Sequence, residues 1–136
     1  MKNKNILFII IFLIILLFFV FYGNVKINKP GPSVKYFDIE LRITNYTNVQ
    51  VTENNVIFYS PPNKTISGEI SIRNNEDKWS NIQISVSGDL QENNWLKLDE
   101  DSFKLDKGKG KLIKITLITP ETAAGNYTSK LSIITS

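Results

Sequence analysis

The chain has 136 residues, which leaves room for one domain of ordinary size and a short additional segment. Its 16 Lys and Arg residues against 13 Asp and Glu residues give a formal charge of +3, and no basic stripe interleaves with stacking aromatic residues. A nucleic-acid partner is therefore not expected. The sequence has no histidine and no cysteine, which excludes disulfides, imidazole and thiolate metal sites, and Ser–His or Cys–His catalytic pairs. We expect no cofactor and no enzymatic activity.

An uninterrupted apolar segment lies close to the N-terminus. Residues 6–22 are rich in Ile, Leu and Phe, and as a helix rising roughly 1.5 Å per residue they would extend about 25 Å. That length is slightly less than the roughly 30 Å hydrocarbon core of a bilayer. Lys2, Lys4 and Lys26 flank the segment and can extend their ammonium groups toward lipid headgroups. The segment is therefore predicted to span a membrane once.

A cleaved secretory signal is the alternative, because residues 1–5 form a short positively charged start. The apolar segment is longer than the usual hydrophobic region of roughly 7–15 residues in such signals. No small-x-small cleavage site follows it, since Phe21-Tyr22-Gly23 places an aromatic residue where a small one is needed. We therefore favour an uncleaved signal-anchor in the cell membrane. The very short N-terminal tail favours an orientation with the C-terminal domain outside, although the Lys/Arg bias is small.

The second part of the chain has the pattern of a β domain. Phe37, Ile39 and Leu41 alternate with polar residues, as in a half-buried strand. Similar short apolar or alternating runs recur, separated by turn signals, and no helical period is convincing after residue 33. We predict an all-β, immunoglobulin-like sandwich of two sheets and about seven strands, with a small up-and-down barrel as the alternative. The expected organisation is a tail at 1–5, a transmembrane helix at 6–23, a linker at 24–33 and a sandwich at 34–136.

Several residues in the second half follow the order of a known group of domains. They are Gly88, Trp95, Phe103-x-Leu105, a glycine-containing turn, Ile113-x-Ile115-x-Leu117, and Pro120 with Ala123, Ala124, Gly125 and Tyr127. This order resembles the immunoglobulin-like modules of archaeal and bacterial surface proteins and is similar to the NPCBM-associated domain linked to α-galactosidases. The match covers about residues 66–134, and the Pro-to-Gly-x-Tyr ending is its most specific part. The resemblance implies a spacer or binding accessory without an active site.

The candidate ligand contacts are one lysine-rich turn and one tryptophan. Lys107, Lys109 and Lys111 alternate with two glycines in a segment expected to be a hairpin turn, with contact to an anionic wall polymer or to headgroups as the functional alternative. Trp79 and Trp95 are either core anchors or sugar-stacking platforms, and the anchor role is favoured, more strongly for Trp95. Tyr127 is expected to pack and to cap nearby backbone with its hydroxyl.

Two further sets of residues have a functional interpretation beside a simpler one. The acidic run at residues 99–101 is expected to be a solvated loop, since adjacent residues of an extended chain point in opposite directions and cannot easily share a calcium ion. Three N-x-Thr sequons begin at Asn45, Asn63 and Asn126 and fall at predicted turns, where a glycan would be tolerated. Chance alone would yield roughly two sequons in so Asn-rich a chain.

These observations favour a non-catalytic module on a membrane anchor. The expected partners are the membrane itself and another envelope protein or a cell-wall polymer, contacted through loops and strand edges. Two alternatives stay open. In the first, the chain is a subunit of a surface machine, such as a filament or secretion apparatus. In the second, it is a carbohydrate-binding accessory that uses its tryptophans.

Overall fold

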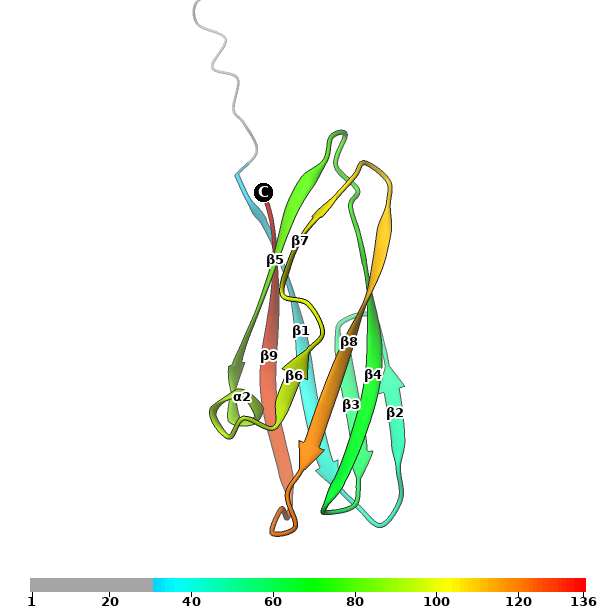
Figure 1. Ribbon diagram of the computed structural model, residues 1–136, viewed down its shortest axis with the longest axis vertical. Coiled ribbons are helices and arrows are strands. Elements are labelled where there is room, and N and C mark those ends of the chain that lie inside the picture. Colours follow the sequence, from blue (N-terminus) through cyan, green and yellow to red (C-terminus); the bar gives the residue numbers. More distant parts are fainter. Residues whose placement is uncertain (1–30) are drawn as a thin grey trace, which may run out of the picture. The chain divides into compact units, whose positions relative to one another are not determined.

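Nine strands and one short helix lie within residues 31–136, the part of the chain that the computed structural model describes (Figure 1). The elements are β1 (Ser33–Ile43), β2 (Asn48–Val51), β3 (Asn55–Ser60), β4 (Lys64–Arg73), β5 (Ser80–Gly88), α2 (Asp89–Glu92), β6 (Leu96–Leu98), β7 (Ser102–Leu105), β8 (Gly110–Thr119) and β9 (Asn126–Thr135). The predicted tail and membrane helix, and residues 24–30 of the predicted linker, lie outside the described residues. Within residues 31–136, no helix is both long and apolar enough to cross a membrane.

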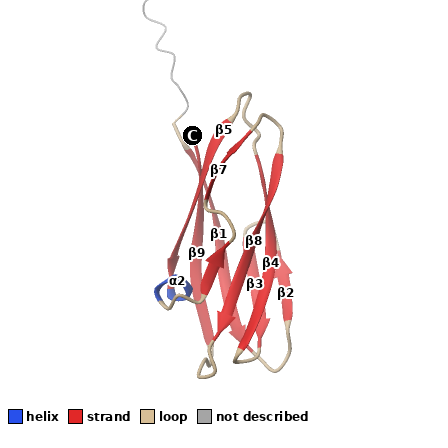
Figure 2. Cartoon of the chain, in the orientation of Figure 1, coloured by secondary structure: helices blue, strands red, loops and turns tan. Residues whose placement is uncertain are grey.

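The strands form two separate sheets, which confirms the predicted all-β, two-layer architecture for this part of the chain (Figure 2). One sheet has six strands in the order β2-β3-β1-β9-β5-β7, and the other has three in the order β4-β8-β6. No hydrogen-bonded ladder joins the two sheets in the described residues, so the arrangement is a sandwich and not the closed barrel weighed as an alternative.

The first strand lies in the interior of the larger sheet. β1 pairs antiparallel with β9 along ten residue pairs and parallel with β3 along six. Phe37, Ile39 and Leu41 point into the core and are buried, while Asp38 on the opposite face is exposed. The alternation predicted from the sequence is therefore confirmed here, and the chain passes from its first described residues directly into the middle of a sheet.

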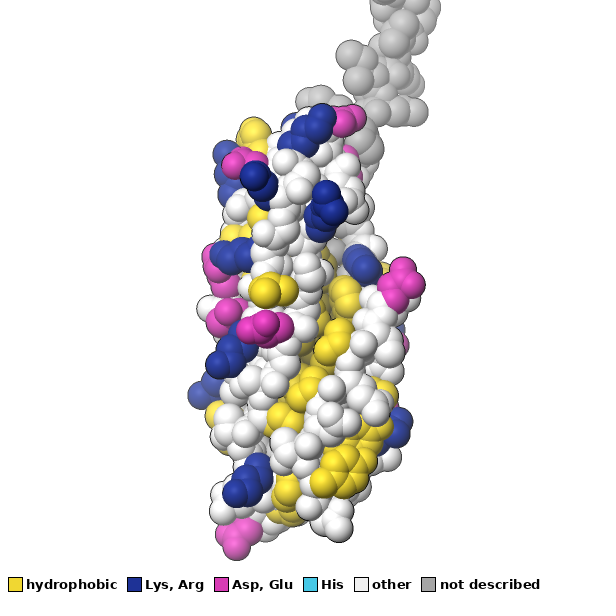
Figure 3. Space-filling model, turned by 90° about the vertical axis from the view of Figure 1, so that its right-hand side faces the viewer, with side chains coloured by type: hydrophobic (Ala, Val, Ile, Leu, Met, Phe, Trp, Pro, Cys, Tyr) yellow, Lys and Arg dark blue, Asp and Glu magenta, His cyan; other side chains and the backbone are white. Residues whose placement is uncertain are grey.

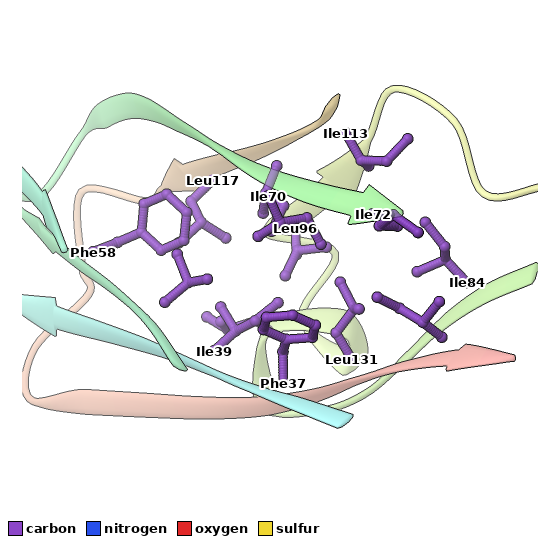
Figure 4. Close-up of a cluster of buried hydrophobic side chains, with 14 of the residues drawn as sticks. Phe37, Ile39, Phe58, Ile70, Ile72, Ile84, Leu96, Ile113, Leu117 and Leu131 are labelled. Carbon is purple, nitrogen blue, oxygen red and sulfur yellow. The ribbon is translucent and has the colours of Figure 1, made fainter. Parts of the chain in front are cut away.

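The core lies between the inner faces of the two sheets and is built almost entirely from aliphatic side chains (Figure 4). Ile113, Ile115 and Leu117 of β8 are fully buried and face side chains such as Ile39 and Leu131 of the larger sheet. Their alternates Leu112 and Ile118 lie on the outer face and are exposed. The nearly continuous apolar run in β8 therefore serves one buried face, and the outer leucine and isoleucine contribute little to the core.

Two expectations about the connections were wrong. The lysine-rich turn does not close a hairpin, because β7 pairs with β5 in the six-stranded sheet and β8 pairs with β4 and β6 in the other. The turn therefore carries the chain from one sheet to the other. The region after β5, where no helix was predicted, holds the single turn of α2 and the short strand β6. Burial of Leu90 and a hydrogen bond from Trp95 N to the Leu90 carbonyl, 2.9 Å, hold α2 on the core.

Candidate functional site at one end of the sandwich

The lysine-rich turn belongs to an end of the sandwich that several distant segments share. We call it the basic end and define it as residues 73–79 and 104–111, the start of β1, the end of β9, and Glu100, whose carboxylate pairs with Lys111. Asn81 exchanges two backbone hydrogen bonds with Ser136, of 2.8 and 3.0 Å. A hollow of about 280 Å³ lies between the sheets at this end. Ser33 and Thr135 of the six-stranded sheet line one side of it, and Arg73 of β4 and Glu76 of the loop after β4 line the other. Figure 1 shows the start of β1 and the C-terminus at the same end as the two loops, 74–79 and 106–109.

A buried asparagine holds the two loops of the basic end together. The Asn74 side-chain amide is almost inaccessible and donates to the carbonyls of Lys78, 2.8 Å, and Leu105, 2.9 Å. Its side-chain oxygen accepts from the backbone N–H of Glu76, 2.9 Å. The Asn74 backbone also exchanges hydrogen bonds with the 106–109 loop, through Lys109 O at 2.9 Å and Gly108 N at 3.0 Å. The charged side chains on both loops are therefore presented from a fixed backbone.

Basic side chains outnumber acidic ones at this end. Seven lie here, namely Lys35, Arg73, Lys78, Lys104, Lys107, Lys109 and Lys111, against the four carboxylates of Glu76, Asp77, Glu100 and Asp106. The rest of residues 31–136 carries five basic and nine acidic side chains. The end therefore has a formal charge of +3 and the remainder −4. Several Lys and Arg side chains gather in the upper part of the face in Figure 3, which corresponds to this end.

The three lysines predicted as ligand contacts share the basic end but differ in their surroundings. Lys107 Nζ lies 3.1 Å from Asp77 Oδ1, where both side chains are exposed. Lys111 pairs with Glu100 and lies over the Phe103 ring at 4.6 Å. Lys109 is exposed and has no carboxylate partner within residues 31–136. Exposed ion pairs of this kind contribute only about 0–1 kcal/mol, so the paired lysines can exchange partners at little cost.

The two tryptophans have different environments. Trp95 is partly buried, packs against the core and meets the Tyr127 ring edge to face with centroids 4.7 Å apart, which agrees with its predicted anchoring role. Trp79 is 49% exposed, so it is not a buried anchor. Lys104 Nζ lies 3.6 Å from the centroid of the Trp79 ring and covers one of its faces. Trp79 and Lys104 therefore form a surface pair within the basic end.

Most of the basic end could not be predicted from the sequence. Lys35, Arg73, Lys78 and Lys104 are scattered through the chain and only the strand topology brings them to the turn that holds Lys107. The lysine-rich turn was the one local signal, because its lysines are close together in sequence.

The three sequons lie together on the opposite end of the sandwich. Asn45, Asn63 and Asn126 are all exposed. Backbone hydrogen bonds join the loops around them: Asn63 N to Pro120 O at 3.2 Å, Ile43 N to Gly125 O at 3.0 Å, and Thr44 N to Ser60 O at 3.1 Å. Asn45 and Asn63 lie in turns, as predicted, whereas Asn126 is the first residue of β9 and not a turn residue. The Tyr127 hydroxyl accepts from Ala124 N at 3.3 Å and caps this end, as predicted.

The larger hollow, about 660 Å³, lies on the outer face of the six-stranded sheet and is open and polar. Asp38, Glu40, Asn55, Asp89 and Lys130 contribute to its lining. It does not gather a metal-binding set, because no group of three or more carboxylates within residues 31–136 is positioned to hold an ion.

Several carboxylates of this face and of the 99–101 run, among them Glu40, Asp99 and Glu100, have partners within the protein. Arg42 donates two hydrogen bonds to Glu40, of 2.7 and 2.9 Å, and this pairing holds the pKa of Glu40 below its ordinary value while it raises the pKa of Arg42. In the 99–101 run, Asp99 Oδ1 accepts from Lys114 N at 3.0 Å and Glu100 pairs with Lys111. These carboxylates point to separate partners.

Comparison with known proteins returned no match: no family model, no curated protein and no solved structure is similar to this chain at a significant level.

Proposed function

We propose that the chain is a single-pass membrane protein that presents a non-catalytic, immunoglobulin-like sandwich outside the cell membrane for contact with another envelope protein or a cell-wall polymer. The observation that carries the proposal is the order of its parts. An uninterrupted apolar segment at residues 6–22 is followed, about ten residues later, by the first strand of a β-sandwich that begins at Ser33. A module so placed stays near one membrane surface.

The composition supports a binding role over a catalytic one. The chain contains no histidine or cysteine, so the commonest general base and the thiolate nucleophile are missing. Two of the carboxylates, Glu40 and Glu100, are engaged separately, the first by Arg42 and the second by Lys111. A tethered binding module needs neither group, and confinement near a membrane raises the effective concentration of its partners, so weak contacts suffice.

Crosslinking in native membranes, followed by mass spectrometry of the captured partners, tests this proposal. We expect crosslinks from lysines of the sandwich to one or a few envelope components, with the full chain recovered from the membrane fraction. A matched sample crosslinked after detergent solubilisation should lose the weak partners, because it loses the confinement that the membrane provides. Crosslinks confined to cytoplasmic proteins would contradict the proposed location.

A further inference from the structure

We propose that the basic end of the sandwich is a docking surface for anionic lipid headgroups of the membrane in which the chain is anchored. This inference rests on the proposed function, because it assumes that residues 6–22 hold the chain in a bilayer. It adds a lipid-binding surface and a preferred orientation: the basic end toward the lipid, and the end with Asn45, Asn63 and Asn126 away from it.

The place at which the chain joins the sandwich supports this orientation. Ser33, the first residue of β1, lines the hollow of the basic end together with Arg73 and Glu76. The roughly ten residues between the apolar segment and Ser33 reach at most about 35 Å, even when fully extended. The tether therefore leaves from the basic end and holds it within reach of the membrane surface.

The charge distribution favours the same orientation. Within residues 31–136 the basic end carries +3 and the remainder −4, so the described part has a net charge of only −1. An anionic surface would attract one end and repel the other, and this orienting effect acts within a Debye length of about 10 Å at 0.1 M salt. A uniformly basic domain would bind such a surface without preferring one end.

Most of the cations at the basic end are available to a ligand. Only Lys107 and Lys111 of its seven basic residues form ion pairs within residues 31–136. The remaining five are Lys35, Arg73, Lys78, Lys104 and Lys109. Each basic side chain near an anionic membrane shifts the docking equilibrium about fivefold, so removal of three should weaken docking about a hundredfold.

The absence of cysteine from the chain allows a clean experiment, because one introduced cysteine takes a single fluorescent donor. Ser136→Cys labels the basic end and Thr122→Cys labels an exposed loop of the opposite end. The full chain is reconstituted into vesicles that contain an acceptor-labelled lipid. The vesicles are phosphatidylcholine alone, or phosphatidylcholine with about a third phosphatidylglycerol. Energy transfer to the acceptor reports how close each end lies to the lipid.

Two triple variants with equal charge change provide the comparison. Lys78→Gln/Lys104→Gln/Lys109→Gln removes cations of the basic end, and Lys64→Gln/Lys97→Gln/Lys130→Gln removes the same charge elsewhere. We expect phosphatidylglycerol to increase transfer from the Ser136→Cys label and decrease it from the Thr122→Cys label. The first triple variant, or about 1 M salt, should abolish this difference, and the second triple variant should keep it.

Equal transfer from both labels in both lipids, or equal effects of the two triple variants, would overturn the inference. The inference would also be overturned, in favour of a wall polymer, by two results together. Soluble polyglycerol phosphate would change the fluorescence of the Ser136→Cys label, and phosphatidylglycerol would leave the energy transfer from that label unchanged. Flotation of the same vesicles after a carbonate wash separates the two proposals. Loss of the chain from the vesicles would refute the anchor, whereas retention without lipid-dependent transfer would refute only the docking surface.

Discussion

Gly68 of β4 lies directly against Val49 of β2: a Cβ added at Gly68 would come within 2.9 Å of Val49 Cγ1 and 3.2 Å of the Phe58 ring. The missing side chain allows an edge of the small sheet to approach the large one. We predict that Gly68→Ala lowers the free energy of unfolding by about 1–3 kcal/mol through overpacking. Urea denaturation of residues 31–136, which contain every strand of both sheets, would measure it.

Gly110→Ala is the matched control for this prediction. A Cβ at Gly110 meets only the Ile72 carbonyl at 3.5 Å, an ordinary contact, and its backbone is not in the left-handed region. We expect a change within about 0.5 kcal/mol. Val49→Ala in the Gly68→Ala background should recover part of the loss. Equal effects of the two glycine substitutions would show that the close approach at Gly68 does not limit packing.

Substitution of Asn74 should destabilise the basic end. Asn74→Ala removes two donated hydrogen bonds and leaves the carbonyls of Lys78 and Leu105 without this partner. We expect a loss of about 2–4 kcal/mol in the free energy of unfolding, because buried polar groups left unpaired are costly. Asn75→Ala, at the exposed neighbouring residue, should change it by less than about 0.5 kcal/mol. Similar values for the two variants would contradict the bridging role of Asn74.

Glu40 should contribute a small, pH-dependent part of the stability. Its hydrogen bonds with Arg42 lower its pKa below the ordinary value of 4.5, so the folded state favours the ionised carboxylate. The stabilisation is present above about pH 4.5 and is lost as the pH falls through the lowered pKa. We expect Glu40→Gln to cost less than about 1 kcal/mol at neutral pH, since the pair is partly exposed, and nothing in strong acid. Thermal melts of both proteins from pH 7 to pH 2 would show whether the difference disappears.

Tyr127→Phe should have a modest effect at the end of the sandwich opposite the basic end. It removes the hydrogen bond from Ala124 N but keeps the ring that meets Trp95 at 4.7 Å. We predict a loss of about 0.5–1.5 kcal/mol by urea denaturation. Tyr127→Ala, which also removes the aromatic contact and leaves a cavity, should cost several times more. A phenylalanine variant as unstable as the alanine variant would contradict this division.

Strand periodicity in the sequence predicted most of the fold. Phe37, Ile39 and Leu41 of β1 were identified as core residues because a strand places alternate side chains on one face. The same pattern cannot say which sheet a strand joins. The turn with Gly108 therefore suggested a hairpin although its two strands lie in different sheets. α2 is one turn long and too short for a helical period to be visible.

The candidate site was less predictable. Lys107, Lys109 and Lys111 stand out in the sequence because they are close together, but Lys35 and Lys104 join them only through the order of the strands. Trp79 and Trp95 look alike in sequence, and their difference in burial depends on tertiary contacts. Local patterns therefore indicated part of the basic end, and its net charge emerged only from the topology.

Membrane attachment is the claim on which the proposed function depends. Native membranes containing the full chain would be washed with alkaline carbonate, and the intact mass of the chain would then be measured in the pellet and the supernatant. We predict that the chain stays in the pellet with residues 6–22 still attached, and that a version beginning at residue 31 is released. A chain whose mass corresponds to a start after Gly23, found in the supernatant, would contradict the account.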